Sequence, residues 1–188
     1  MSGVYCVILM SIKLAEHYKT HVVPTLAKEF GYKNLMAVPK IVKVVINVGT
    51  GRIRDEKQLE VLEKQFAMIV GQKSLPRKAK KAIASFKTRI GMVIGYAVTL
   101  RGRRMYEFLE RLIYVALPRT RDFHGIPITS FDGRGNLTIG AKEHIVFPEM
   151  IGEDVRSIFG LEATVVTTAR SREEGIALLR ELGFPLQK

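Results

Sequence analysis

The chain has 188 residues and 47% apolar content, which is enough to bury a hydrophobic core and argues against intrinsic disorder. Its formal charge of +12 and its pI of about 10.0 favour a polyanionic partner. The single cysteine, Cys6, excludes an intrachain disulfide and a cysteine-based zinc site, a usage typical of proteins in a reducing cytoplasm.

The first residues predict an extension before the folded part. MSGVYCVILM is apolar, but it has no charged leading region and no small-residue cleavage site, so it does not resemble a signal peptide. It is also far shorter than the roughly 20 residues that a membrane span requires. We therefore interpret residues 1–9 as an N-terminal extension, Met10 as a second candidate start, and residues 10–188 as one domain.

Eight elements are predicted from apolar periodicity and from the residues that begin and end helices and strands. Gly31 and Gly71 are suited to end helices, whereas Pro24 and Pro118 are expected to bend or stop them. In chain order, the predictions are a helix over 11–30 bent at Pro24, a strand over 38–51, a helix over 55–71, a strand over 92–101, a helix over 103–116 that ends before Pro118, strands over 136–142 and 163–169, and a helix from 171 onwards.

Local signals support several of these elements. Asp55 is a candidate N-cap for the second helix. Ser171 and Glu174 have the spacing of a capping box at the start of the last helix. The segment 132–135, DGRG, predicts a turn whose glycines supply positive φ angles. Since strands and helices interleave without an internal repeat, the sequence predicts an α+β fold: two layers, a mainly antiparallel sheet with helices packed on one face, and an extended basic loop.

The strands have two different faces. Large apolar residues alternate with small, hydroxyl, amide and basic residues, so one face is expected to pack on the helices and the other to stay open. Small side chains let an RNA backbone lie close, and four polar ones can bond phosphates and 2′-hydroxyls: Lys43, Asn47, Thr99 and Arg101. The alternative is that this face is only solvated.

Nearly all of the excess charge lies in one segment. Residues 64–106 hold eleven basic residues and no acidic one, whereas the rest of the chain holds 19 basic and 18 acidic residues. The densest part is RKAKKAIASFKTR, 77–89. An ordinary solvated surface mixes its charges, so this stretch predicts a polyanion-binding loop. Attachment to an anionic membrane is the weaker interpretation, because the run is short and is followed by glycines at 91 and 95.

No catalytic, metal or cofactor motif emerges from the sequence. His17 and His21 have the spacing of a helical metal pair, but no third ligand is evident nearby. Gly49 and Gly51 follow a strand as in a dinucleotide loop, yet Arg54 occupies the place of the third glycine, so a strand-ending turn is the better interpretation. The sequence therefore predicts a protein that is not an enzyme and needs no cofactor.

Six blocks of the sequence resemble, in order and at the right spacing, the bacterial-type ribosomal protein five of the large subunit, which binds 5S rRNA. The resemblance runs from about residue 10 to residue 188. The blocks are VPKIVKVVINVGTG, RKAKKAIASFKTRIGM, VTLRGRRMYEFLERLI, LPRTRDFHGI, FDGRGNLTIGAKEHIVFPE and VTTARSREEGIALLRELGFPLQK.

The resemblance implies a ribosome-bound, cytoplasmic protein of the central protuberance, with no role at membranes. Its implied partners are 5S rRNA, 23S rRNA, P-site tRNA, small-subunit protein thirteen across an intersubunit bridge, and other central protuberance proteins. The candidate 5S rRNA contacts are Lys43, Asn47, Gln72, Thr99 and Arg101, and the candidate tRNA contacts are Arg77, Lys78, Lys80, Lys81, Phe86, Lys87 and Arg89.

The sequence departs from the usual family residue at Val93, Ala97, His124 and Leu137. The alternative function, from another class, is a free-standing RNA-binding protein that regulates or folds RNA away from the ribosome.

Overall fold

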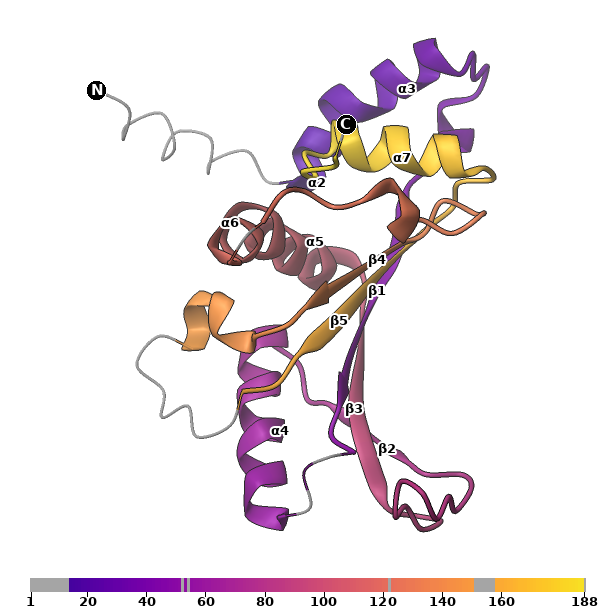
Figure 1. Ribbon diagram of the computed structural model, residues 1–188. Coiled ribbons are helices and arrows are strands. Elements are labelled where there is room, and N and C mark those ends of the chain that lie inside the picture. Colours follow the sequence, from indigo (N-terminus) through magenta and orange to yellow (C-terminus); the bar gives the residue numbers. More distant parts are fainter. Residues whose placement is uncertain (1–13, 52, 54, 122, 151–157, 188) are drawn as a thin grey trace, which may run out of the picture.

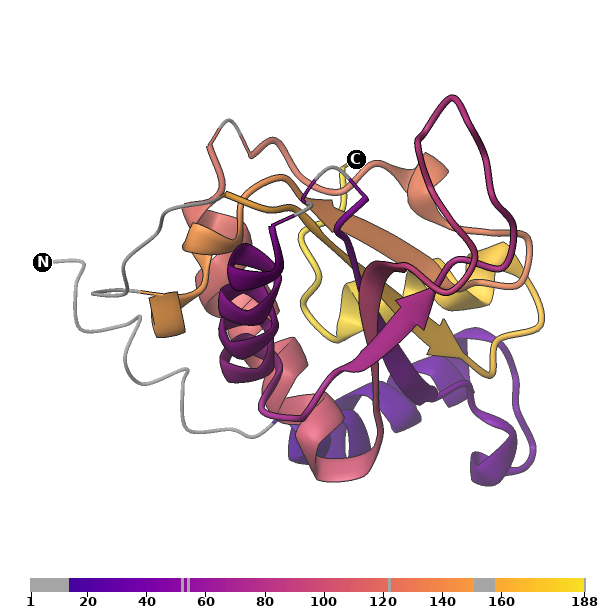
Figure 2. The same cartoon turned by 90° about the horizontal axis from the view of Figure 1, so that it is seen from below.

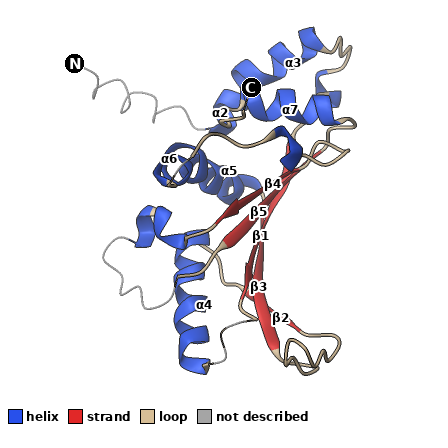
Figure 3. Ribbon diagram, in the orientation of Figure 1, coloured by secondary structure: helices blue, strands red, loops and turns tan. Residues whose placement is uncertain are grey.

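The computed structural model describes residues 14–187 except 52, 54, 122 and 151–157, so the predicted extension over residues 1–9 lies outside the described part. One sheet carries helices on one side, and further helices gather at the end where the first strand begins (Figures 1 and 3). The strands are β1 (Ile41–Gly49), β2 (Leu75–Lys78), β3 (Val93–Leu100), β4 (Leu137–Ala141) and β5 (Leu161–Thr167).

The helical elements are of three kinds. The α-helices are α2 (Leu14–His17), α3 (Val23–Glu29), α4 (Glu56–Val70), α5 (Gly102–Arg111), α6 (Leu117–Arg119) and α7 (Arg172–Glu181). Two π-helical turns, η2 (Tyr18–Val22) and η4 (Leu112–Ala116), join α2 to α3 and α5 to α6. The 3₁₀ turns are η3 (Leu35–Ala37), η5 (Ile128–Ser130), η6 (His144–Val146) and η7 (Pro148–Met150).

The sheet has the order β2-β3-β1-β5-β4, and all four strand pairings are antiparallel. Its central strand β1 shows why the sequence folds this way: Val44, Ile46 and Val48 are buried against the helices, while the residues between them face outward. The same period buries alternate residues of β4 and β5. The α+β prediction is confirmed, with a fully antiparallel sheet.

Helix α4 forms where the sequence predicts it. Asp55 caps its N-terminus, accepting a hydrogen bond from the backbone N–H of Lys57 at 3.1 Å. Gly71 ends the helix in the left-handed conformation at φ +73°. Leu62, Phe66 and Ile69 are buried on one face, so the helix covers the half of the sheet near the start of β3 (Figure 1).

One predicted proline boundary needs correction. The third helical region does not end before Pro118 but continues to Arg119, whereas the first continues through Pro24 as predicted. In each case a π-helical turn ends two residues before the proline. A π-turn moves the hydrogen-bond register from i−4 to i−5, so the missing proline N–H and the bulk of its ring are accommodated inside a continuous helix.

Strand β2 is absent from the prediction. Arg77 and Lys78 were expected in a loop, but they lie in this edge strand, where Arg77 pairs with Gly95 and Lys78 with Val93. The segment has no β-branched residue and contains Pro76, so nothing local marks it as a strand. Its place at the edge explains how a proline is tolerated, because one side of an edge strand needs no hydrogen-bond partner.

The DGRG turn packs against α7 and is fixed to the end of β5 by hydrogen bonds. Asp132 Oδ1 accepts hydrogen bonds from the N–H groups of Arg134 and Asn136, at 2.9 and 2.8 Å. Asn136 Oδ1 accepts from the N–H of Thr167 at 2.9 Å, which ties the turn to the end of β5. Of its two glycines, only Gly135 has a positive φ, +73°, so the prediction is correct for one of them.

The capping box at α7 forms in a modified way. Ser171 Oγ accepts from the N–H of Glu174 at 3.3 Å, as predicted. The Glu174 carboxylate accepts instead from the N–H of Arg170, at 2.8 Å, one residue before the expected donor. Helix α7 therefore begins with its first turn fixed against the chain that leaves β5.

Candidate nucleic-acid interface

The open face of the sheet can be read from the strand register. One row across the strands consists of Leu75, Ala97, Asn47, Glu162 and Gly140, in the order β2, β3, β1, β5, β4. The next row holds Thr99, Val45, Thr164 and Thr138. Most of these residues are small or polar, as the sequence predicts, so a polymer backbone can approach the sheet closely.

Three of the predicted 5S rRNA contacts lie together on this face. Asn47 and Thr99 are exposed and occupy adjacent rows, and Lys43 is half-buried on β1 beyond them. Asn47 and Thr99 are diagonal neighbours, roughly 7–8 Å apart, and Lys43 lies roughly 13 Å from Asn47 along β1, so one RNA segment can touch all three.

The other two predicted contacts lie at one border of the open face. Arg101 directly follows β3 and is exposed; it is the N-cap residue of α5, which has no side-chain capping bond. Gln72 is half-buried between α4 and β2, three residues before Leu75. Since β2 runs antiparallel to β3, the chain before Leu75 lies on the side of Thr99, which brings Gln72 near the same border.

Glycine at position 95 keeps this face flat. A Cβ atom there would lie 2.7 Å from the carbonyl oxygen of Val48, a backbone atom that cannot rotate away. Gly95 pairs with Gly49 on β1 and with Arg77 on β2. No side chain can therefore stand at this position beside Arg77, and Gly95 itself is buried.

The connection between β2 and β3 forms a small hairpin of its own. The N–H of Ala79 donates to the carbonyl of Met92 at 2.8 Å, and Ile83 and Thr88 exchange backbone bonds of 3.3 and 3.2 Å. Lys87 adopts φ +50° at the tip, the one positive φ among the described non-glycine residues. Figure 2 shows this hairpin extending beyond the end of the sheet.

All of the basic residues predicted to contact tRNA are exposed, and among the described residues none of them has an acidic ion-pair partner. Within the hairpin these are Lys80, Lys81, Lys87 and Arg89, and on β2 they are Arg77 and Lys78. The structure therefore gathers the predicted tRNA residues at one end of the sheet. The predicted 5S rRNA residues lie along its face.

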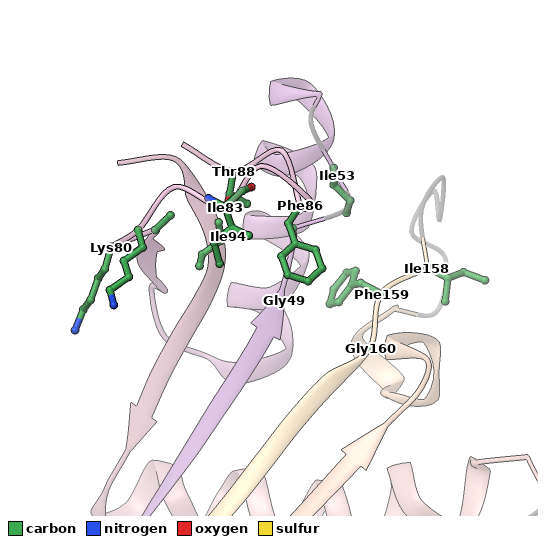
Figure 4. A pocket seen from close by; sticks show the side chains of 13 residues that line it. Gly49, Ile53, Lys80, Ile83, Phe86, Thr88, Ile94, Ile158, Phe159 and Gly160 are labelled. Carbon is green, nitrogen blue, oxygen red and sulfur yellow. The ribbon is translucent and has the colours of Figure 1, made fainter. Parts of the chain in front are cut away.

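Phe86 shares its surroundings with Lys80 and Lys81. It lines an open hollow between the hairpin, the end of β1 and residues 158–160, and Phe159 lines the same hollow (Figure 4). The side chain is still 69% exposed. Ile94, predicted to join the buried face of β3, also lines this hollow and is 36% exposed.

The contribution of β5 and β4 to the open face was not predicted from the sequence. Glu162 was left outside the predicted strand, which began at Ala163, and Thr164 and Thr138 were not singled out. The alternation of β5 carries the signal, because Leu161, Ala163 and Val165 are buried and the residues between them face outward.

His144 is fully buried and stacks on the ring of Phe159 with 3.9 Å between centroids. Its Nδ1 accepts from the N–H of Phe159 at 3.3 Å, so Nε2 carries the proton and finds no partner among the described residues. Burial lowers the pKa of His144 and outweighs the raising effect of the Glu143 charge. The neutral ring is a core residue.

The described residues hold no group of three or more side chains with the donor atoms of a metal site. His17 and His21 stack on each other with 5.2 Å between centroids, and His17 Nε2 lies 3.0 Å from the carbonyl oxygen of Glu181. No helix in the described part of the chain is long and apolar enough to cross a membrane.

Comparison with known proteins gives a consistent result over nearly the whole chain. The family model "Ribosomal protein L5" matches residues 34–89, and the model for the C-terminus of the same ribosomal family matches residues 93–186. The large ribosomal subunit proteins uL5 of Streptococcus thermophilus and Streptococcus pneumoniae are 51% and 52% identical over 180 residues, covering 95% of this chain and 100% of each relative. The uL5 protein of Streptococcus pyogenes is 51% identical over the same coverage.

Proposed function

Because the chain belongs to the bacterial ribosomal protein L5 family, and is thus a structural constituent of the large ribosomal subunit, we propose that it binds 5S rRNA through the open face of its sheet. The members of this family are structural proteins of the cytoplasmic ribosome and not enzymes. Family membership favours this ribosomal role over the alternative that the sequence alone left open, a free-standing RNA-binding protein that regulates or folds RNA.

The observation that carries the proposal is the makeup of the open face. Asn47 and Thr99 offer amide and hydroxyl groups in adjacent rows, and Gly95 adds no side chain beside them. Lys43 and Arg101 add positive charge at the border of this surface. Polar groups of this kind recognise the 2′-hydroxyls and phosphates of folded RNA, and they select its shape more than its sequence.

The second part of the proposal concerns the β2–β3 hairpin, which we assign to P-site tRNA. Its exposed lysines and Arg89 present positive charge, and none of them forms an ion pair with an acidic residue in the described part of the chain. A surface that must serve every tRNA has to bind phosphates and must not read bases, and lysine clusters meet that requirement. Contacts with 23S rRNA, with small-subunit protein thirteen across an intersubunit bridge, and with other central protuberance proteins belong to the same proposal.

The test of the 5S rRNA assignment is a double substitution, Asn47→Ala with Thr99→Ala. If each side chain makes one good contact, affinity for 5S rRNA falls by about 1–3 kcal/mol in a filter-binding titration. The matched control is Gln58→Ala, an exposed amide on α4 away from the open face. Unchanged affinity of the double variant, with an intact fold by circular dichroism, refutes the assignment.

A further inference from the structure

One residue of the open face has the wrong charge for a simple phosphate-binding surface. Glu162 is exposed and lies opposite Asn47 on one side and Gly140 on the other. It is the one carboxylate among the described residues of this face, and it makes no ion pair within the described part of the chain. A phosphate beside it would be repelled, since nothing described offsets its charge.

Glu162 also sets the direction of a short hydrogen-bond chain. Thr164 Oγ1 lies 3.5 Å from Glu162 Oε1, and Thr138 Oγ1 lies 3.3 Å from Thr164 Oγ1. An ionised carboxylate only accepts hydrogen bonds, so the Thr164 hydroxyl donates to Glu162 and accepts from Thr138. The protons of both hydroxyls are thus used in the hydrogen bonds among these three side chains. The remaining lone pairs of the hydroxyls can accept hydrogen bonds from a ligand.

The open face is therefore divided into two halves of opposite character. The half formed by β2, β3 and β1 carries donors and positive charge, from Arg77, Thr99, Asn47 and Lys43. Within the half formed by β5 and β4, the Glu162, Thr164 and Thr138 side chains offer acceptors. An RNA segment fits both halves only if its phosphates lie over the first and its hydrogen-bond donors lie over the second.

We propose that Glu162 is a specificity-determining residue, which rejects phosphate and accepts a hydrogen bond from a donor group of the bound RNA. RNA offers two kinds of hydrogen-bond donor away from its phosphates. One is the sugar 2′-hydroxyl, and the other is the amino or imino group of a base edge, from which carboxylates accept hydrogen bonds. The inference rests on the proposed binding of 5S rRNA to this face and adds the orientation of the RNA on it.

The first experiment compares Glu162→Gln with Glu29→Gln, a control that removes the same charge from the exposed end of α3. Each variant is titrated with 5S rRNA and with an unrelated structured RNA of equal length. For Glu162→Gln, affinity for the unrelated RNA rises and affinity for 5S rRNA does not rise with it, so their ratio falls about tenfold. For the control the ratio stays constant. An equal ratio in both variants overturns the proposal.

The second experiment distinguishes the two donors. 5S rRNA transcripts with sparse 2′-deoxy substitution, or with inosine in place of guanosine to remove an amino group, are selected for binding to the wild-type protein and to Glu162→Gln. A position where substitution weakens binding to the wild type but not to the variant identifies the group that Glu162 accepts from. Identical interference patterns overturn the proposal.

Failure of this inference is separable from failure of the proposed function. If Asn47→Ala with Thr99→Ala lowers 5S rRNA affinity and Glu162→Gln behaves as its control does, the face binds 5S rRNA and only the role of Glu162 is wrong. If neither variant differs from the wild type, the face does not bind 5S rRNA. Because Glu162 is exposed and glutamine has the same shape, thermal unfolding of the variant should match the wild type.

Discussion

Substitution of Gly175 by alanine should destabilise the protein, although alanine is the better helix residue. Gly175 lies buried in the first half of α7, against the DGRG turn. A Cβ atom there would lie 2.4 Å from both the Cα and the carbonyl oxygen of Gly135. Both are backbone atoms, so no side-chain rotation relieves the overlap, and either the helix or the turn must move.

The magnitude follows from two opposing terms. Overpacking of a tight site costs about 1–3 kcal/mol, and backbone overlap places this site at the upper end of that range. Alanine returns up to about 1 kcal/mol through helix propensity and the smaller entropy of the unfolded chain. A net destabilisation of about 2 kcal/mol lowers the Tm of a chain of this length by about 4–8 °C.

Urea unfolding followed by circular dichroism measures the change in free energy, and Gly133→Ala is the matched control. Gly133 belongs to the same turn, has no positive φ, and would place a Cβ atom in open space. Its alanine variant should be as stable as the wild type or slightly more so. If Gly175→Ala proves as stable as Gly133→Ala, the close packing of α7 on the turn does not constrain this position and the prediction is wrong.

Two further predictions concern the hairpin and the core. Replacing Lys80, Lys81 and Arg89 together by alanine should leave 5S rRNA affinity nearly unchanged and weaken P-site tRNA retention, and each phosphate interaction removed should flatten the log–log salt slope by roughly 0.7–0.9. A large decrease in 5S rRNA affinity with unchanged tRNA retention would show that the two surfaces are assigned the wrong way round. The pKa of His144 in the folded protein lies below its ordinary 6.5, so the unfolded chain binds the extra proton. The contribution of His144 to the free energy of unfolding should therefore be fully present above about pH 6.5 and be lost as the pH decreases. His144→Phe should flatten this dependence in urea unfolding at pH 7.5 and 5.5, and an unchanged slope would contradict it.

Elements with local signals were predictable from the sequence. Asp55 and Gly71 mark the two ends of α4, and Ser171 marks the start of α7, because capping bonds involve residues only a few positions apart. The alternation of β1 and β3 in the sequence likewise indicates which residues face the helices. On that basis the sequence places Lys43, Asn47 and Thr99 on a common face, and the structure confirms this placement.

Features that depend on distant residues were not predictable. Strand β2 exists because Leu75–Lys78 pairs with β3 about twenty residues later along the chain, while its own residues have weak strand preference. The predicted helix end before Pro118 was wrong because a π-turn before this proline keeps the helix continuous. The role proposed for Glu162 depends on the strand register that places it beside Asn47, and no local sequence pattern reveals this pairing.

The central claim is that 5S rRNA covers the open face and leaves the hairpin free. Lysine acetylation read by mass spectrometry tests it on the unaltered protein, with and without 5S rRNA. Lys43 lies on the open face, Lys80 and Lys81 lie in the hairpin, and Lys28 and Lys57 on the helices serve as references. We expect 5S rRNA to protect Lys43 while the hairpin and reference lysines react as in the free protein. Protection of Lys80 and Lys81 with Lys43 still reactive would contradict the claim.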